Sequence, residues 1–288
     1  MPTYMPNEYG SFDFSGKPVI EHLVFYPPLS KIRLMQEEAC FLYQVKANNR
    51  LYAASQNIQL GSQEAVVMKC GNYISKYFTL DTPGPSEVVV RHFYPEMLRE
   101  IYKNDLPAFM QGKGDSSGIL IRNVDVDAII QGYIKSILFY FRNPSIVTGE
   151  LILLKVKELI LLLARTEENS KKIKLIFQEL FSPSRINFSE IVESNLYEDL
   201  SLQELASLCH MSLASFHRKF KEIFEESPAN YFRKEKIEKS KRLLAGTKMR
   251  INEVAWECGF GTISHFSKVF KRQTGVTPKR FRILSATQ

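Results

Sequence analysis

Residues 251–282 read INEVAWECGFGTISHFSKVFKRQTGVTPKRFR, and this stretch decides the fold of the last third of the chain. It begins with a short segment of helical periodicity around the small residue Ala255. A turn at Cys258-Gly259-Phe260 follows, where the glycine can adopt a left-handed conformation at little cost, and then a second helical segment. The stretch therefore predicts a helix-turn-helix module.

The same pattern occurs earlier in the chain, which makes it an internal repeat. The first matched positions are separated by one constant offset, and the later ones by an offset one residue longer, with His210-Met211 at the first turn. The repeat predicts two copies of one module. The matched pairs are Leu202/Ile251, Glu204/Glu253, Leu205/Val254, Ala206/Ala255, Cys209/Cys258, Phe216/Phe266, Phe220/Phe270, Lys221/Lys271, Pro228/Pro278 and Tyr231/Phe281.

Helix starts are marked by capping residues. Ser201 with Glu204 forms a capping box, in which each side chain satisfies a free backbone amide of the other residue. Ser212 is placed to cap the next helix. Ser227-Pro228 and Thr277-Pro278 each put a capping residue before a proline at the first helical position. These signals predict short helices with defined starts.

The second helix of each copy has one apolar face. Phe216, Phe220 and Phe224 recur every four residues, as do Phe266 and Phe270, so these rings must face a core. Small, polar and cationic residues occupy the opposite face, as expected either for a helix in a major groove or for an ordinary solvated surface. The residues that we expect to bind DNA are Ala214, Ser215, His217, Arg218, Lys221, Arg250, Thr262, Ser264, His265, Ser267, Lys268 and Lys271.

The positive charge is concentrated in the same region. The formal net charge is +7, but from His210 to the end 17 Lys and Arg stand against 7 Glu, and the preceding residues carry a small net negative charge. A basic end on an acidic body indicates that one part of the chain meets a polyanion, although a merely soluble basic surface is the alternative.

The stretch 251–282 also resembles the signature of the AraC/XylS family of bacterial transcription regulators, and the resemblance extends over about 188–282. It implies two recognition helices on one long connecting helix at 228–244, reading adjacent major grooves of promoter DNA, with activation and contact with RNA polymerase. The connecting helix departs from the family pattern at Lys236-Ile237 and Ser240. Arg250 replaces the usual Ser or Thr cap, and its cation opposes the helix dipole unless a phosphate is nearby; simple exposure is the alternative.

The region before the repeat changes character once. Short apolar runs between about 20 and 92, separated by Gly and Pro, predict strands of a small barrel or sandwich, with a hairpin turn at Asn48-Asn49. Helical periodicity follows at 128–142, 151–164 and 173–180. We expect an α+β two-domain protein: a cupin-like β-barrel with flanking helices at 1–181, a linker at 182–187 around Ser182-Pro183-Ser184, and an all-α DNA-binding domain at 188–288.

The function of the front domain is less specified by sequence. It is only distantly similar to the family's sensor domain, so the effector is either a small molecule or a protein partner. The helices at 128–164, including Ile137, Leu138, Phe141, Leu153, Leu159 and Leu162, either support a homodimer or pack on the barrel.

Several classes of function are disfavoured. The front half has only His22 and His92 with no HxH or HxxE pattern, which disfavours a metal site, and no catalytic motif or cofactor loop is visible. Four scattered Cys and no export or membrane-spanning segment favour the cytoplasm. We expect a non-enzymatic regulator. The alternatives are an architectural DNA binder without sequence preference and an enzyme with a DNA-binding appendage.

Overall fold

The structure is a computed structural model that describes residues 8–35, 38–69, 71–79, 84–103, 107, 110, 120–180 and 188–285. The expected linker, 182–187, lies outside these residues. The contacts divide the chain into two compact units, Met1–Ile186 and Asn187–Gln288, which are described separately below. Within the described ranges, no helix is both long and apolar enough to cross a membrane.

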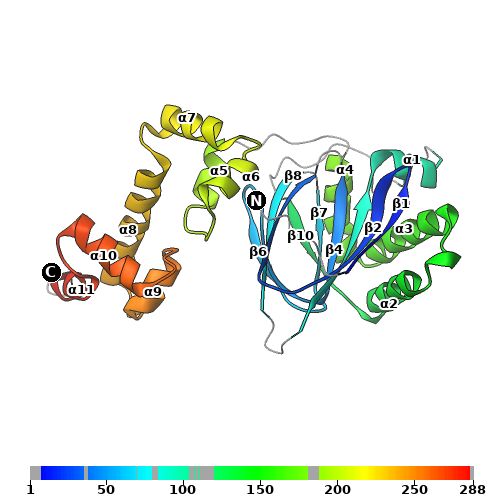
Figure 1. Ribbon diagram of the computed structural model, residues 1–288, viewed down its shortest axis with the longest axis horizontal. Coiled ribbons are helices and arrows are strands. Elements are labelled where there is room, and N and C mark those ends of the chain that lie inside the picture. The colour runs from blue at the N-terminus through cyan, green and yellow to red at the C-terminus, as the bar shows by residue number, and fades with distance from the viewer. Residues whose placement is uncertain are drawn as a thin grey trace. The chain divides into compact units, whose positions relative to one another are not determined.

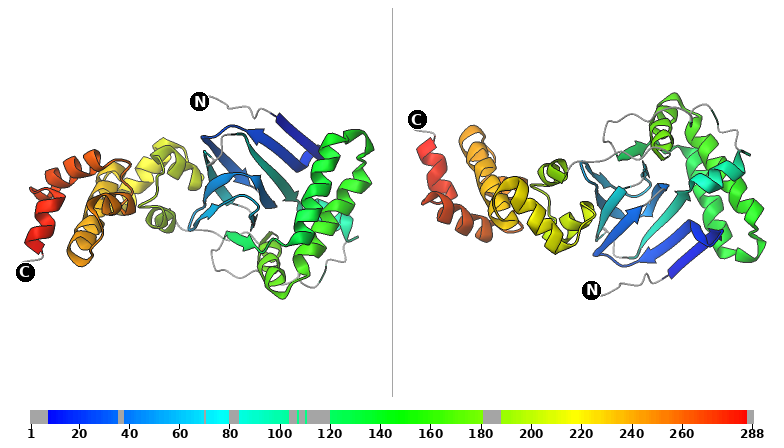
Figure 2. Two further views of the ribbon diagram at one scale, coloured as in Figure 1. Left: turned by 90° about the horizontal axis from the view of Figure 1, so that it is seen from below. Right: turned by 90° about the horizontal axis from the view of Figure 1, so that it is seen from above.

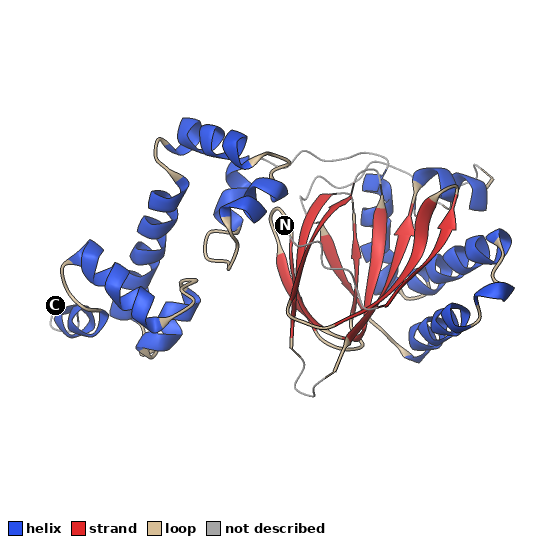
Figure 3. Ribbon diagram, viewed as in Figure 1, coloured by secondary structure: helices blue, strands red, loops and turns tan. Residues whose placement is uncertain are grey.

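The N-terminal unit is built on two antiparallel sheets (Figures 1 and 3). One has the strand order β1-β2-β9-β4-β7-β10, and the other has the order β3-β8-β5-β6. The expected α+β architecture is confirmed. The strands are β1 Glu8–Phe14, β2 Lys17–Phe25, β3 Leu29–Met35, β4 Ala39–Lys46, β5 Asn48–Tyr52, β6 Asn57–Leu60, β7 Ala65–Met68, β8 Gly71–Phe78, β9 Ser86–Phe93 and β10 Ile121–Val124.

The hairpin expected at Asn48-Asn49 is wrong. These residues belong to β5, where Asn48 pairs with Phe78 and Asn49 with Tyr77, and neither has a positive φ. The chain leaves one sheet at the end of β4 and enters the other at β5, past the fully buried Ala47. A two-residue hairpin turn would instead have kept both strands in one sheet.

Helices cover one face of the larger sheet (Figure 2). They are α1 Pro95–Ile101, α2 Ala128–Arg142, the short 3₁₀ helix Pro144–Ile146, α3 Gly149–Ala164 and α4 Glu167–Leu180. Alternate residues of the strands, such as Phe41 and Phe93, pack against apolar residues of the helices, such as Leu159 and Phe177. The side chain of Asp127 caps α2 by accepting from the amides of Ile129 and Ile130.

The apolar residues of α2 and α3 that the sequence assigns either to a dimer contact or to packing on the barrel are largely used inside the unit. Ile137 and Leu159 are fully buried, and Phe141 stacks on Phe12 of β1 with ring centroids 4.5 Å apart. Leu154 and Leu161 of α3 are more than half exposed instead. Packing on the sheet therefore accounts for the residues named from the sequence, while a different stripe of α3 is left uncovered.

The C-terminal unit is helical throughout its ordered elements. Its helices are α5 Phe188–Ser194, α6 Leu202–Leu208, α7 Leu213–Phe224, α8 Pro228–Gly246, α9 Ile251–Glu257, α10 Ile263–Thr274 and α11 Pro278–Ser285. The expected capping box of Ser201 and Glu204 is present, and Ser212 caps α7. Ser227 occupies the cap of α8, but its side chain makes no capping hydrogen bond.

Both copies of the repeat fold in the same way. In the second, Gly259 has φ +70° and Phe260 donates its amide to the carbonyl of Ala255 at 3.0 Å. In the first, His210 has φ +56° and Met211 donates to Ala206 at 2.9 Å. The turn without glycine thus closes α6 with the same pair of hydrogen bonds that closes α9.

Each copy encloses its own aromatic core. In the first, Phe216 and Phe220 are fully buried and Phe220 lies 5.5 Å from the ring of Tyr231 on α8. In the second, Phe270 lies 5.4 Å from Phe281 on α11, which is the matched position. Aromatic contacts of this kind contribute about 0.5–1.5 kcal/mol beyond the area that they bury. The spacing of the phenylalanines therefore fixes which face of α7 and α10 points outward.

Candidate DNA-binding surface

The helices α7 and α10 begin in matching ways. The hydroxyl of Ser212 accepts from the amide of Ser215 at 3.2 Å, and the hydroxyl of Thr262 accepts from the amide of His265 at 3.2 Å. These caps define the first turn of each helix and thereby the direction in which its outward side chains project. Phe216 and Phe266 hold the opposite face in the core.

The structure leaves nearly all of the candidate residues accessible to solvent. Ser215 and Ser267 are half-buried. The remaining ten are exposed: Ala214, His217, Arg218, Lys221, Arg250, Thr262, Ser264, His265, Lys268 and Lys271.

Two of the candidate hydroxyls are already engaged. Thr262 uses its oxygen as the cap of α10, and Ser215 accepts a hydrogen bond from the hydroxyl of Ser212 at 3.1 Å. A capping hydroxyl still has its own proton to donate, so Thr262 could donate to a phosphate without giving up its cap. Its first role in this fold is nevertheless to start the helix.

Arg250 stands at the N-cap of α9, and its side chain does not cap the helix. The carboxylate of Glu253 accepts from the backbone amide of Arg250 at 2.6 Å instead. A negative group in the first turn offsets the unfavourable effect of a cation at the positive end of the helix dipole. The start of α9 is thus held without a Ser or Thr, and the exposed guanidinium of Arg250 is free to meet another anion.

The cations of the candidate surface are exposed side chains. Within the part of the chain that the structure describes, no ion pair holds Arg218, Lys221, Arg250, Lys268 or Lys271. Unpaired, exposed cations on one helix face attract a polyanion at long range.

By contrast, lysines along α8 do have partners. Lys239 pairs with Glu257 at 3.3 Å, and Lys241 pairs with Glu238 at 2.7 Å. The free positive charge of this unit therefore includes its two recognition-type helices, whereas the connecting helix uses several of its lysines internally.

Six further exposed cations of this unit were missing from the sequence-based set: Lys234, Arg242, Lys248, Arg272, Lys279 and Arg280. Lys279 and Arg280 stand in the first turn of α11, whose start is capped by Thr277, which accepts from the amide of Arg280 at 3.3 Å. The available signal was the pairing of a Thr-Pro helix start with two basic residues, because cations in a first turn are unfavourable unless an anion lies close by.

The connecting helix α8 sets the separation of the two modules. Figure 1 shows α7 near one end of α8 and α10 near the other. With 19 residues, α8 is about 28 Å long at a rise of about 1.5 Å per residue. One turn of B-DNA measures roughly 34 Å, so a spacer of this size suits two helices in successive major grooves on one face of a duplex.

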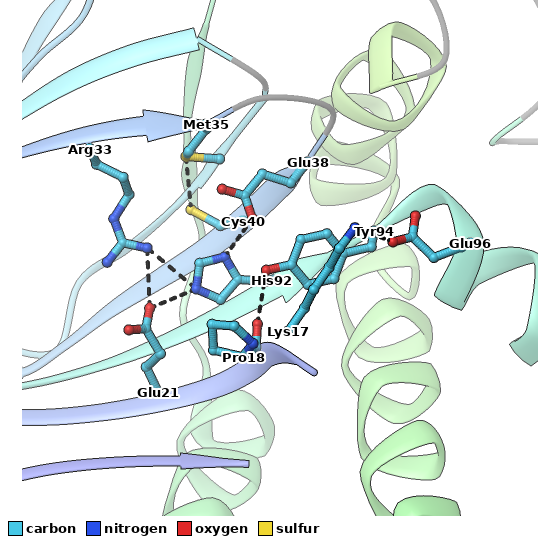
Figure 4. A network of polar contacts seen from close by, with 10 residues as sticks. All are labelled: Lys17, Pro18, Glu21, Arg33, Met35, Glu38, Cys40, His92, Tyr94 and Glu96. Carbon is cyan, nitrogen blue, oxygen red and sulfur yellow. Dashed lines mark hydrogen bonds and ion pairs between the residues drawn. The ribbon is translucent and has the colours of Figure 1, made fainter. Parts of the chain in front are cut away.

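The N-terminal unit contains a buried polar network (Figure 4). His92 on β9 contacts Glu21 of β2 through Nε2 at 2.7 Å and Glu38 through Nδ1 at 2.9 Å. Arg33 of β3 donates to the same Glu21 carboxylate at 3.3 Å. The network ties strands of both sheets together.

Electrostatics favour the charged form of these groups. Burial lowers the pKa of His92, but its hydrogen bonds to Glu21 and Glu38 outweigh burial and raise it overall. Burial raises the pKa of Glu21, and the contacts with His92 and Arg33 reverse this and bring it to about 2. Both ring nitrogens of His92 are occupied by carboxylates, and no cluster of potential metal ligands occurs among the described residues.

Comparison with known proteins gives two family matches. A helix-turn-helix domain family matches residues 205–283, and the ExsA N-terminal regulatory domain family matches residues 39–175. The first match spans the two modules, and the second spans most of the sheets and helices α1 to α3.

Among relatives, the HTH-type transcriptional regulator GbdR of Pseudomonas aeruginosa is 32% identical over 118 residues, 40% of this chain and 32% of GbdR. The bifunctional transcriptional activator/DNA repair enzyme AdaA of Bacillus subtilis is 34% identical over 97 residues, 34% of this chain and 46% of AdaA. The chain thus spans a third to about half of the length of these two relatives. The crystal structure of unsaturated fatty acid bound ToxT from Vibrio cholerae aligns over 92% of this chain and 94% of ToxT, with 10% identity and a TM-score of 0.39.

The regulatory-domain match and the helix-turn-helix match lie in the order that the two units of the structure have along the chain. Together with the repeated modules on α8, these matches indicate an N-terminal regulatory domain followed by a helix-turn-helix domain. The chain belongs to the AraC/XylS family of transcription regulators.

Proposed function

We propose that this protein is a cytoplasmic, sequence-specific regulator that binds double-stranded promoter DNA by inserting α7 and α10 into adjacent major grooves. The observation that carries the proposal is the pair of matched helices, each capped at its start and anchored by two buried phenylalanines. Each is lined outward by exposed cations that have no ion-pair partner among the described residues. A duplex presents phosphates and base edges at the spacing that α8 allows.

The candidate residues divide by reach. Arg218 and Lys268 lie one turn into their helices, where a long cation meets a guanine edge or a phosphate. Ala214 and Ser264 are short enough to let the first turn approach the bases. The polar residues beside them, His217, His265 and Ser267, add further contacts to base edges, while Lys221, Arg250 and Lys271 bind the phosphate backbone.

We propose that the protein activates transcription and does so through contact with RNA polymerase. AdaA is named a transcriptional activator, as is the HTH-type transcriptional activator RhaS of an Enterobacter species, which is 30% identical over 91 residues. We propose no catalytic residue and no cofactor, although AdaA is also a repair enzyme. The residues of the candidate surface are binding groups, and the cysteines Cys40, Cys209 and Cys258 are buried.

We further propose that the chain forms a homodimer through the helices at 128–164. The support is the exposed stripe of α3, where Leu154 and Leu161 are 62% and 54% exposed and lie two helical turns apart. Phe139 of α2 is also more than half exposed. Isolated exposed apolar residues are common, but a repeated stripe on a helix suits a symmetric partner.

Sedimentation tests the dimer. The variant Leu154→Glu/Leu161→Glu should sediment as a monomer at concentrations where the unmodified chain is dimeric. Glu158→Gln, a polar change between the two leucines, is the matched control. An unmodified chain that stays monomeric on and off DNA at every concentration would contradict the proposed dimer.

The effector is a small molecule or a protein partner acting on the N-terminal unit, and native mass spectrometry of freshly isolated protein distinguishes the two.

Footprinting on genomic fragments tests the function itself. We expect discrete protected sites that survive a large excess of unrelated competitor DNA, because specific sites are typically bound about 10³-fold or more tightly than random DNA. An architectural DNA binder would instead protect all fragments alike and lose every footprint to the competitor.

A further inference from the structure

The two helix-turn-helix modules touch at a point other than the ends of α8. The segment between α5 and α6, in the first module, brings Tyr197 against the turn between α9 and α10 in the second. A Cβ built on Gly259 would collide with the carbonyl oxygen of Tyr197 and would lie 2.8 Å from Nζ of Lys236. The backbone of one module therefore rests directly on the turn of the other.

The repeat provides an internal control for the role of Gly259. Its counterpart His210 adopts the same left-handed conformation, with φ +56° against +70°, and makes the equivalent hydrogen bonds with a side chain present. His210 is exposed, whereas Gly259 is covered by Tyr197. The turn conformation alone thus does not demand glycine; the close approach of Tyr197 does.

Two lysines of α8 reinforce the same junction. Lys236 donates to the carbonyl of Gly259 at 2.7 Å, and Lys239 donates to the carbonyl of Glu257 at 2.7 Å. Ammonium groups at the end of α9 satisfy carbonyls that the helix leaves free and complement its dipole. Lys239 also lies 4.1 Å from the ring centroid of Tyr197, within cation–π range. One residue of α8 therefore binds both modules at once.

We propose that this junction, formed by Tyr197, Lys236, Lys239 and Gly259, is a positioning device that fixes the separation and rotational phase of α7 and α10. Without it, α8 would be the connection between two small modules that have separate aromatic cores. With it, the pair acts as one rigid reader of DNA. The proposal rests on the proposed function for its DNA consequence, but the rigidity itself is a property of the free protein.

The free protein gives the first test. Spin labels at the matched exposed positions Glu222→Cys on α7 and Arg272→Cys on α10, with Cys70→Ser, report the distance distribution between the helices by electron–electron double resonance. We expect a narrow distribution in the otherwise unmodified chain and a broad one after Lys239→Met, which keeps the aliphatic stem and removes the ammonium. Gly259→Ala, which introduces the clash, should broaden it as well. His210→Ala, the same side chain at the matched turn, should not.

The spacing of the DNA site gives the second test. Affinity is measured for the target site and for a duplex with one base pair inserted between the two recognition elements of that site. One base pair rotates a recognition element by about 34–36°, so a rigid reader loses the contacts of one module, on the order of 100-fold in affinity. Lys239→Met should reduce this loss to below about 10-fold. A substitution that only destabilises the fold would lower the affinity for both duplexes equally and leave the ratio of the two affinities unchanged.

The outcomes separate cleanly. If Lys239→Met and the unmodified chain have equal distance distributions and equal ratios of affinity for the two duplexes, the proposed positioning role of the junction is wrong. Broadened distributions in Lys239→Met, combined with no specific DNA binding by the unmodified chain, would support the junction and refute the proposed function. Gly259→Ala is judged only if its circular dichroism spectrum matches that of the parent, and Lys239→Met decides the question otherwise.

Discussion

Truncating one cation on each recognition helix should weaken specific DNA binding without weakening the fold. Arg218 and Lys268 are exposed and, among the described residues, have no ion-pair partner, so alanine at either position should change the free energy of unfolding by less than about 0.5 kcal/mol. A cation that reads a base contributes roughly 1–3 kcal/mol, or about 5- to 150-fold in affinity. The two residues lie in different modules, so their losses should add, and the double variant should bind at least about 30-fold more weakly.

A mobility-shift titration on the footprinted site measures the loss, with Lys234→Ala on α8 as the control. Arg218→Lys separates the two kinds of contact, because lysine keeps a phosphate contact but loses the two-pronged geometry that recognises guanine. Each phosphate contact removed should also lower the salt slope by about 0.9. If Arg218→Ala and Lys268→Ala both bind as tightly as the parent, the assignment of the outward helix face is wrong.

Three further predictions concern salt, pH and the isolated domain. Lys221, Arg250 and Lys271 give three phosphate contacts, or five if Arg218 and Lys268 also meet phosphate, and these imply an affinity loss on the order of 40- to 500-fold between about 50 and 200 mM salt. A flat response in the same titration would argue against DNA as the ligand. The interactions that raise the pKa of His92 stabilise the fold fully at pH values below 6.5, the ordinary pKa of histidine, and this contribution is lost as the pH rises through the raised pKa. The contribution of Glu21 is lost only as the pH falls from 4.5, the ordinary pKa of glutamate, towards about 2. Thermal unfolding should therefore show a decline in Tm as the pH rises above about 6.5 that His92→Gln lacks, and identical pH profiles for both proteins would contradict the charged network. The fragment 187–288 should bind one target site on its own, because both cores lie within it; a fragment that is folded by circular dichroism but inert towards the full-length target would show that the N-terminal unit supplies part of the DNA interface.

The C-terminal helices could be predicted from sequence because their signals are local. The capping box of Ser201 and Glu204 and the four-residue spacing of Phe216 and Phe220 lie within one or two helical turns. The turn of the first module lacks the glycine that predicts a left-handed conformation in the second. His210 nevertheless adopts the left-handed conformation, which histidine tolerates better than most residues.

The sheets were harder to predict because strand pairing is not local. The sequence-based strands began at about residue 20, so β1 was not predicted. In the structure it forms a hairpin with β2 through a tight turn at Ser15 and Gly16, which both have positive φ. The apparent hairpin at Asn48-Asn49 failed because the chain switches sheets there, which no short-range signal reports. The apolar runs between about 20 and 92 thus predicted that this region forms strands, but not how the strands pair.

The functional details divide in the same way. The outward faces of α7 and α10 follow from helical geometry once the phenylalanines are placed. The network around His92 could not be found, because Glu21, Arg33 and His92 come from three strands far apart in sequence. The covered state of Gly259 was equally invisible, since it depends on Tyr197 of the other module.

Methylation interference on the footprinted site tests the central claim most directly, because methylation at guanine N7 blocks contacts in the major groove alone. The account predicts two clusters of interfering guanines about 10–10.5 base pairs apart on one face of the duplex for each protomer. Arg218→Ala should abolish interference in one cluster and Lys268→Ala in the other. A single cluster, or interference that neither variant changes, would contradict the reading of adjacent major grooves by α7 and α10.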